Sequence, residues 1–157
     1  MQKWSLPPRI KLYEALGAVA DERVKANAGT GRVRSSSGQK SYDVTYDPST
    51  GAINSNDNAS YWVGYIGYPA VAYLLAAGVV PWDREVAQWL KGVHWKDLNT
   101  RFRNDYSKTE TYVRDSVTKA GGDLRRLDKQ LDEISGALAA LRLMKTHSGR
   151  KPPPRGY

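Results

Sequence analysis

Basic side chains on a predicted β-hairpin give this sequence its clearest candidate chemistry. Arg32 and Arg34 alternate with Val33, which places both guanidinium groups on one face of a strand, and Lys40 follows the turn. A two-stranded ribbon of this kind can lie along a row of phosphates, to which the hydroxyls of residues 35–37 can donate hydrogen bonds. The spacing therefore predicts phosphate contacts by this hairpin.

Cations on a predicted helix and on a basic tail extend this prediction. At about 100° per residue, a helix that begins at Trp95 aligns Lys96 with two arginines further along, although interspersed carboxylates could pair with them. Residues 146–157 form a proline-rich basic tail that we expect to be extended in isolation. The predicted nucleic-acid-binding residues are Arg32, Arg34, Lys40, Arg103, Arg114, Arg150, Lys151 and Arg155.

Composition favours an anionic partner. Among 157 residues, 24 lysines and arginines stand against 16 carboxylates, for a net charge of +8. The chain has no cysteine and two histidines, which excludes disulfides, thiolate chemistry and cysteine-ligated metals. No cofactor is therefore expected. The longest apolar stretch, residues 65–80, is interrupted by glycine and proline and falls short of the roughly 18 residues of a membrane span.

The candidates for catalysis are few. His94 is the one plausible base, no nucleophile elbow accompanies it, and no glycine-rich phosphate loop occurs. Asp57 lies in an asparagine-rich loop, residues 54–58, where it could help bind Ca²⁺. The better interpretation is that these side chains bond the backbone of their own loop. We expect a protein that is not an enzyme.

The elements that must position these residues belong to the α+β class. Apolar spacing predicts a helix over residues 5–24, then a small antiparallel meander of three strands at 32–35, 42–46 and 52–54. Proline at the start and glycine just past the end bound an all-round apolar helix at 69–77, which should occupy the core. We expect one α+β domain over residues 1–145, with residues 83–145 as its helical part.

The helical part should end in an αα-hairpin. Apolar positions from Trp95 to Val117 fall on one face of a helix of about seven turns. After Gly121 and Gly122, leucines and one isoleucine from Leu124 to Leu141 follow heptad spacing. This seam could close within the chain onto the Trp95 helix, or it could form a homodimer.

Residues 31–78 also resemble a known module. The segments that carry the resemblance are Val33–Gly38, Tyr42–Tyr46 and Pro69–Ala76, in that order. They resemble the SWIM zinc-finger module, a ββα unit whose family is linked with nucleic-acid binding and protein interaction. Aligning the helix places the four zinc ligands at Ile53, Ser55, Gly67 and Pro69, none of which binds zinc.

The resemblance therefore implies a metal-free descendant. Structural zinc supplies on the order of 10 kcal/mol to a small module, and burial of large side chains must offset its loss. We hypothesise that an aromatic and aliphatic cluster replaces the metal. Its members are Ile53, Tyr61, Trp62, Tyr65, Ile66, Tyr68 and Tyr73.

Three functions remain, in order of preference. The first is a non-enzymatic, cytoplasmic protein that binds DNA or RNA through phosphates, with little base recognition. The second is a structural subunit or adaptor whose tail and helical hairpin dock into a larger assembly, such as a ribonucleoprotein. A hydrolase of nucleic acids comes last, because the sequence has no acidic cluster.

Overall fold

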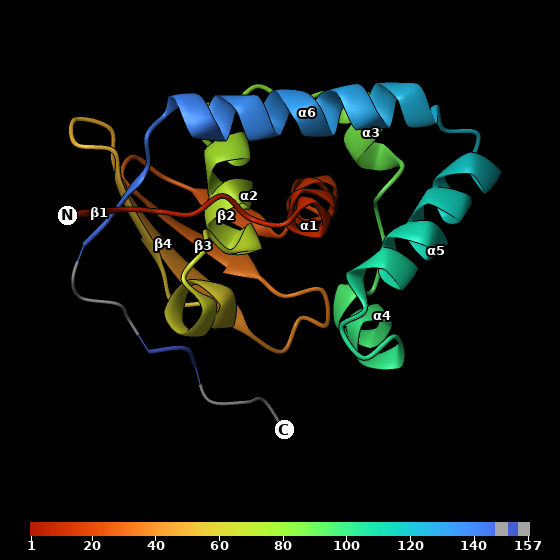
Figure 1. Cartoon of the computed structure of the whole chain (residues 1–157), viewed down its shortest axis with the longest axis horizontal. Coiled ribbons are helices and arrows are strands. Elements are labelled where there is room, and N and C mark those ends of the chain that lie inside the picture. Colours follow the sequence, from red (N-terminus) through yellow and green to blue (C-terminus); the bar gives the residue numbers. More distant parts are fainter. Residues whose placement is uncertain (147–150, 154–157) are drawn as a thin grey trace.

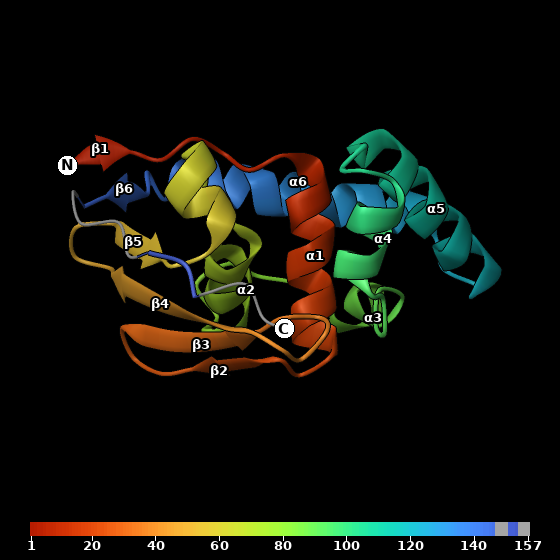
Figure 2. The ribbon, with the colours of Figure 1, turned by 90° about the horizontal axis from the view of Figure 1, so that it is seen from below.

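The structure is a computed structural model that describes residues 1–146 and 151–153. Within these residues, one mixed sheet has the strand order β1-β6-β5-β4-β3-β2 (Figures 1 and 2). All neighbouring strands are antiparallel except β5 and β6. The strands are β1 (Gln2–Lys3), β2 (Val24–Ala26), β3 (Thr30–Arg34), β4 (Ser41–Asp47), β5 (Ala52–Ser55) and β6 (Met144–Lys145). The α+β class is confirmed.

The predicted meander corresponds to β3, β4 and β5, and the sheet extends beyond it on both sides. Strand β2 lies where the first helix was expected to continue. That helix, α1 (Arg9–Ala20), ends earlier because Glu22 takes a positive φ of 56° and turns the chain into β2. On the other side, β6 pairs with β5, and β1 pairs with β6 to form the edge of the sheet.

Helix α2 (Tyr68–Ala76) lies against the concave side of the sheet, as Figure 2 shows. Every residue from Pro69 to Leu75 is buried, so the predicted core helix is confirmed. It contacts α1 on one side and strands β2 to β5 on the other. One apolar core, which extends from Trp4 to Leu143, joins the sheet to the helices.

The long helix expected from Trp95 is wrong, because the chain forms two helices there. Helix α4 (Trp95–Arg101) ends, and α5 (Tyr106–Lys119) begins after Asp105, whose carboxylate accepts from the Lys108 amide. Between them, Arg103 and Asn104 take positive φ values of 52° and 60°. These angles end the helical path and redirect it.

The αα-hairpin is confirmed for α5 and α6 (Leu124–Ala140), which glycines 121 and 122 connect. Figure 1 shows α6 running along one side of the molecule. Its seam packs within the chain, against α1, α3 (Arg84–Gln88) and α5 rather than α4. The fully buried seam residues are Leu127, Leu131, Ile134 and Leu138. These four side chains are therefore not available to a second copy.

The cluster proposed to replace zinc is only partly buried. Ile53, Ile66 and Tyr73 lie in the core, but Trp62 is 68% exposed and Tyr61 lies at the surface beside it. Both rings belong to a short π-helical turn, η1 (Ala59–Val63), that projects from the core. Their assignment to the cluster was therefore wrong.

Every helix among the described residues is too short or too polar to cross a membrane. The described residues contain no group of three or more histidine, aspartate or glutamate side chains that could hold a metal ion.

Candidate anion-binding site

A pocket of about 290 Å³, lined by both polar and apolar surface, lies between the β3–β4 loop and helices α1 and α4. Its lining also includes Arg23, from the turn between α1 and β2, residues 57–59 from the loop after β5 and the start of η1, and Tyr68 at the start of α2. Four cationic side chains and two carboxylates line the pocket. They are Lys11, Arg23, Lys40 and Lys96, with Glu14 and Asp57. The lining therefore carries a surplus of positive charge.

Arg23 is the most enclosed of these cations, with 7% of its surface exposed. Its Nε lies 3.2 Å from Asp21 Oδ2, and its Nη1 donates to the carbonyl oxygen of Arg34. Its Nη2 is buried and, within the described part of the chain, has no hydrogen-bond partner. Leaving a buried charged donor unpaired costs about 1–3 kcal/mol or more, so this atom calls for a partner.

Glu14 is 3% exposed and pairs with groups from two elements. Lys11, three residues earlier on the same face of α1, places Nζ 3.0 Å from Oε2. From α4, Asn99 donates through Nδ2 to Oε1 at 2.9 Å. Burial lowers the pKa of Lys11, but the carboxylate of Glu14 more than compensates and raises it, so Lys11 stays charged.

Asn99, which lines the pocket, has a buried acceptor that no described residue bonds. Because its Nδ2 is bonded to Glu14, its Oδ1 faces away from that bond, and this buried oxygen has no partner among the described residues. Four lining residues thus hold a buried polar atom without a hydrogen-bond partner among the described residues: Arg23 Nη2, Asn99 Oδ1, Trp95 Nε1 and Glu14 Oε2, the last of which forms an ion pair with Lys11.

Serine hydroxyls organise the β3–β4 loop. Ser35 Oγ accepts from the Lys40 amide at 3.1 Å, and Ser37 Oγ lies 3.1 Å from Ser35 Oγ. Ser36 Oγ accepts from the Lys96 amide at 3.4 Å, which ties the loop to the start of α4. A hydroxyl that accepts in this way keeps its own hydrogen for donation. Ser36 can therefore still donate a hydrogen bond to a phosphate, as the sequence predicts.

Asp57 has a structural role. Its Oδ1 accepts from the Ser60 amide at 3.1 Å, and its Oδ2 accepts from the Ser60 hydroxyl at 2.6 Å. Asn56 similarly accepts from the Asp43 amide at 2.8 Å. Gly67 leaves room for the Asp57 carboxylate, since a Cβ there would lie 2.6 Å from Oδ2. The interpretation that these side chains bond the backbone of their own loop therefore holds for Asp57, whereas Asn56 bonds the backbone of β4 instead.

Two tyrosines form an aromatic wall of the pocket. The rings of Tyr42 and Tyr68 meet edge to face, with centroids 6.3 Å apart. Burial raises the pKa of both phenols, and in Tyr68 the nearby guanidinium of Arg23 only partly opposes this rise. Both phenols are therefore neutral at physiological pH.

The hairpin cations lie as predicted relative to the strand. Arg32 and Arg34 are exposed on the face opposite the buried Val33. Arg32 Nε lies 3.2 Å from Asp43 Oδ1 on the neighbouring strand, so its charge is partly matched. Arg34 has no ion pair among the described residues, and Lys40 lines the pocket.

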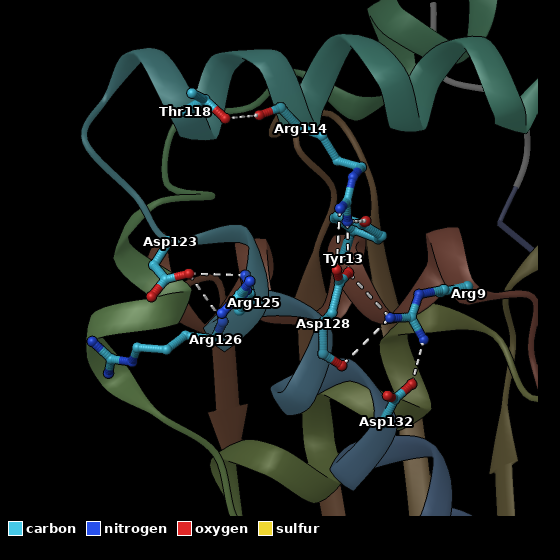
Figure 3. Close-up of polar contacts among 9 residues, drawn as sticks. All are labelled: Arg9, Tyr13, Arg114, Thr118, Asp123, Arg125, Arg126, Asp128 and Asp132. Carbon is cyan, nitrogen blue, oxygen red and sulfur yellow. Dashed lines mark hydrogen bonds and ion pairs between the residues drawn. The ribbon is translucent and has the colours of Figure 1, made fainter.

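Arg103 and Arg114 do not extend this site, and the predicted line through Lys96 was wrong. Arg103 lies in the turn that ends α4. Figure 3 shows Arg114 bound to Asp128 and Tyr13: its Nη1 and Nη2 reach the two carboxylate oxygens at 2.6 and 3.1 Å. This arginine connects α5 to α6 and α1.

Replacing Asp128 by asparagine should lower the free energy of unfolding by about 1 kcal/mol at pH 7, because the site is partly exposed. Arg114, followed by Arg9, lowers the pKa of Asp128. A lowered carboxyl pKa stabilises the fold above about pH 4, the ordinary value, and this contribution is lost as the pH falls below it. Urea unfolding at pH 7 and pH 3 measures the effect.

The more exposed Asp132, which also bonds Arg9 in Figure 3, provides the matched control. Its change to asparagine should cost less than about 0.5 kcal/mol. A difference between wild type and Asp128→Asn that is equally large at both pH values would contradict the role assigned to Arg114.

The structure describes only part of the basic tail. Lys151 is exposed, whereas Arg150 and Arg155 lie outside the described residues.

Sequence reasoning missed Lys11, Glu14, Arg23 and Asn99 as site residues. The available indication was a lysine and a glutamate three residues apart on a helix that is otherwise almost entirely buried. Nothing in the local sequence marks Arg23 or Asn99.

Comparisons with known proteins give one family. The sequence model of the family described as "Uncharacterised conserved protein UCP014422" matches residues 4–144. No curated protein and no solved structure matches the chain at a significant level.

Proposed function

The chain belongs to the UCP014422 family, and we propose that it is a non-enzymatic, cytoplasmic nucleic-acid-binding protein. It binds phosphates of DNA or RNA at the pocket and along the adjoining β3–β4 hairpin. The observation that carries this proposal is a group of cations at one place without carboxylate partners. Arg34, Lys40 and Lys96 have no ion pair among the described residues.

Cations elsewhere support the proposal by contrast. Arg9, Arg114 and Arg126 bind carboxylates of neighbouring elements and serve the fold. Around the hairpin, the described residues form two ion pairs, that of Asp43 with Arg32 and that of Asp21 with Arg23. Phosphates can replace water around the remaining cations without breaking an existing ion pair, which is the arrangement that favours binding through the nucleic-acid backbone.

Salt dependence tests the proposal. Binding of a 20-base-pair duplex, followed by fluorescence anisotropy, should weaken about 40-fold between about 50 and 200 mM salt if three phosphates are neutralised. Cations of the tail would make the dependence steeper. A response that is flat with salt, or no binding at about 50 mM, overturns the proposal.

Single variants localise the contact. Arg34→Gln and Lys40→Gln should each reduce the salt dependence by the contribution of about one phosphate. Lys119→Gln is the matched control, because Lys119 is exposed on α5 and pairs with Asp115. Equal effects in all three variants would show that net charge, rather than this site, determines the affinity.

The second candidate function, a subunit or adaptor in a larger assembly, is favoured by the exposed turn η1. Trp62 and Val63 are each 68% exposed, and Tyr61 packs edge to face on Trp62. Exposed aromatic side chains of this kind often anchor protein interfaces. Co-purification of one defined polypeptide that survives nuclease and high salt, and is lost in Trp62→Ser, would select this function.

A further inference from the structure

We propose that the pocket is a site for one nucleotide-sized ligand that carries a phosphomonoester. This ligand can be a free mononucleotide or the phosphorylated end of a nucleic-acid strand. The inference rests on the proposed function only for the strand end.

Arg23 provides the fixed donor for the phosphate. Bonds to Asp21 and to the Arg34 carbonyl hold the guanidinium in place, and Nη2 remains buried without a partner among the described residues. A guanidinium held in this way loses little further freedom when it binds an oxyanion, so the affinity gained per hydrogen bond is high.

The charge of the lining suits a phosphomonoester. The charge of Glu14 is matched by Lys11 in an ion pair, although Glu14 Oε2 has no hydrogen-bond partner among the described residues, and Asp57 accepts two hydrogen bonds from Ser60. Lys40 and Lys96 then add to the charge of Arg23. A phosphomonoester carries about −1.5 to −2 at pH 7, whereas each internal phosphate of a strand carries −1. A terminal phosphate should therefore bind more tightly than an internal one.

Other groups of the lining suit a nucleoside. Asn99 Oδ1 is a buried acceptor with no partner among the described residues, so it requires a ligand N–H or O–H. The rings of Tyr42, Tyr68 and Trp95 line the same pocket and provide flat apolar surface. A nucleoside combines such donors with a flat ring, whereas inorganic phosphate lacks the ring.

The size of the pocket limits what can enter. Its volume of about 290 Å³ lies at the lower end of the range of small-ligand sites. One nucleotide is of this scale, and a duplex is not. The ligand therefore enters as a single unit.

Calorimetry on the full chain tests this inference. Adenosine and guanosine 5′-monophosphates should bind, inorganic phosphate should bind more weakly, and adenosine without phosphate should bind at least tenfold more weakly than its monophosphate. Absence of binding by both monophosphates overturns the inference. Equal binding of adenosine and its monophosphate also overturns it.

Variants identify the pocket as the site. Lys96→Gln should weaken monophosphate binding about tenfold, the effect of one charged hydrogen bond. Lys96 is exposed, so this variant should fold, whereas Arg23→Gln also removes bonds that support the fold. Lys129→Gln, on the exposed face of α6, is the matched control and should bind as wild type does. Equal affinity of Lys96→Gln and wild type contradicts the assignment.

Oligonucleotides distinguish the two sources of the ligand. If the strand end is the ligand, a 5′-phosphorylated strand should bind about tenfold more tightly than its 5′-hydroxyl form, and monophosphate should compete. If the free nucleotide is the ligand, the two strands bind alike. Strand binding without any monophosphate binding overturns this inference and leaves the proposed function intact. The reverse result leaves this inference intact and overturns the proposed function.

Discussion

Lys11→Met should lower the free energy of unfolding by about 3 kcal/mol at pH 7, because it leaves a buried carboxylate without its cation. Glu14 is 3% exposed, and after the change only the Asn99 amide would bond it. Methionine has a length similar to that of lysine and keeps the apolar packing of α1. The loss therefore reports the charge alone.

Urea unfolding measures this loss, and a double variant tests its cause. Lys11→Met combined with Glu14→Gln removes both charges and should recover most of the stability. Lys129→Met is the matched control, because its partner Glu133 is exposed and 3.9 Å away, and it should change stability by less than about 0.5 kcal/mol. A double variant no more stable than Lys11→Met alone would contradict the account of the buried pair.

Gly31→Val should also cost about 3 kcal/mol, at the upper end for an overpacked core. Gly31 lies in β3, where a Cβ would meet the ring of Tyr73, with Cε2 at 2.9 Å. That ring is held in place, since its hydroxyl donates to the Asn27 carbonyl at 2.8 Å. Valine itself favours a strand, so the cost comes from the contact between β3 and α2.

Thermal and urea unfolding measure this cost, with a second glycine as the comparison. Gly136 lies in α6, and nothing lies within 4 Å of a Cβ built there. Gly136→Ala should therefore raise stability by about 0.5–1 kcal/mol through helix propensity. If Gly31→Val is as stable as wild type, the close approach of Tyr73 to the strand is disproved.

Local patterns were enough to predict the central strands and the core helix. Alternation around Val33 and Val44 marked β3 and β4, and Pro69 and Gly78 bounded α2. Strands β1, β2 and β6 have two or three residues each. Segments this short have no periodicity, and they become strands only because a neighbouring strand pairs with them.

The break between α4 and α5 was missed for a different reason. Apolar residues such as Leu98, Phe102 and Val113 continue the helical spacing across it, so periodicity alone predicts one helix. The useful indication was local: Asn104 tolerates a positive φ, and Asp105 is a good N-terminal cap. Here, the turn residues outweighed the pattern.

The site was predicted in part. Lys40 and the serine loop were identified because they belong to one hairpin. Glu14 and Arg23 come from α1 and the turn after it, and Asn99 comes from α4, far away in the sequence. Only the fold brings them together, and their importance follows from burial without full pairing, which no local pattern encodes.

Strand β6 lies between β5 and β1 in the sheet. Lys3 pairs with Met144, and the Trp4 amide donates to the Leu143 carbonyl at 2.9 Å. During synthesis β1 must therefore wait for β6 before it can pair, whereas the two residues after it find partners sooner: Trp4 Nε1 donates to the Ile53 carbonyl, and the Ile66 amide donates to the Ser5 carbonyl. A ribosome stalled before Leu143 would hold a chain in which Trp4 and Ser5 are already anchored, while Gln2 and Lys3 have no strand to pair with.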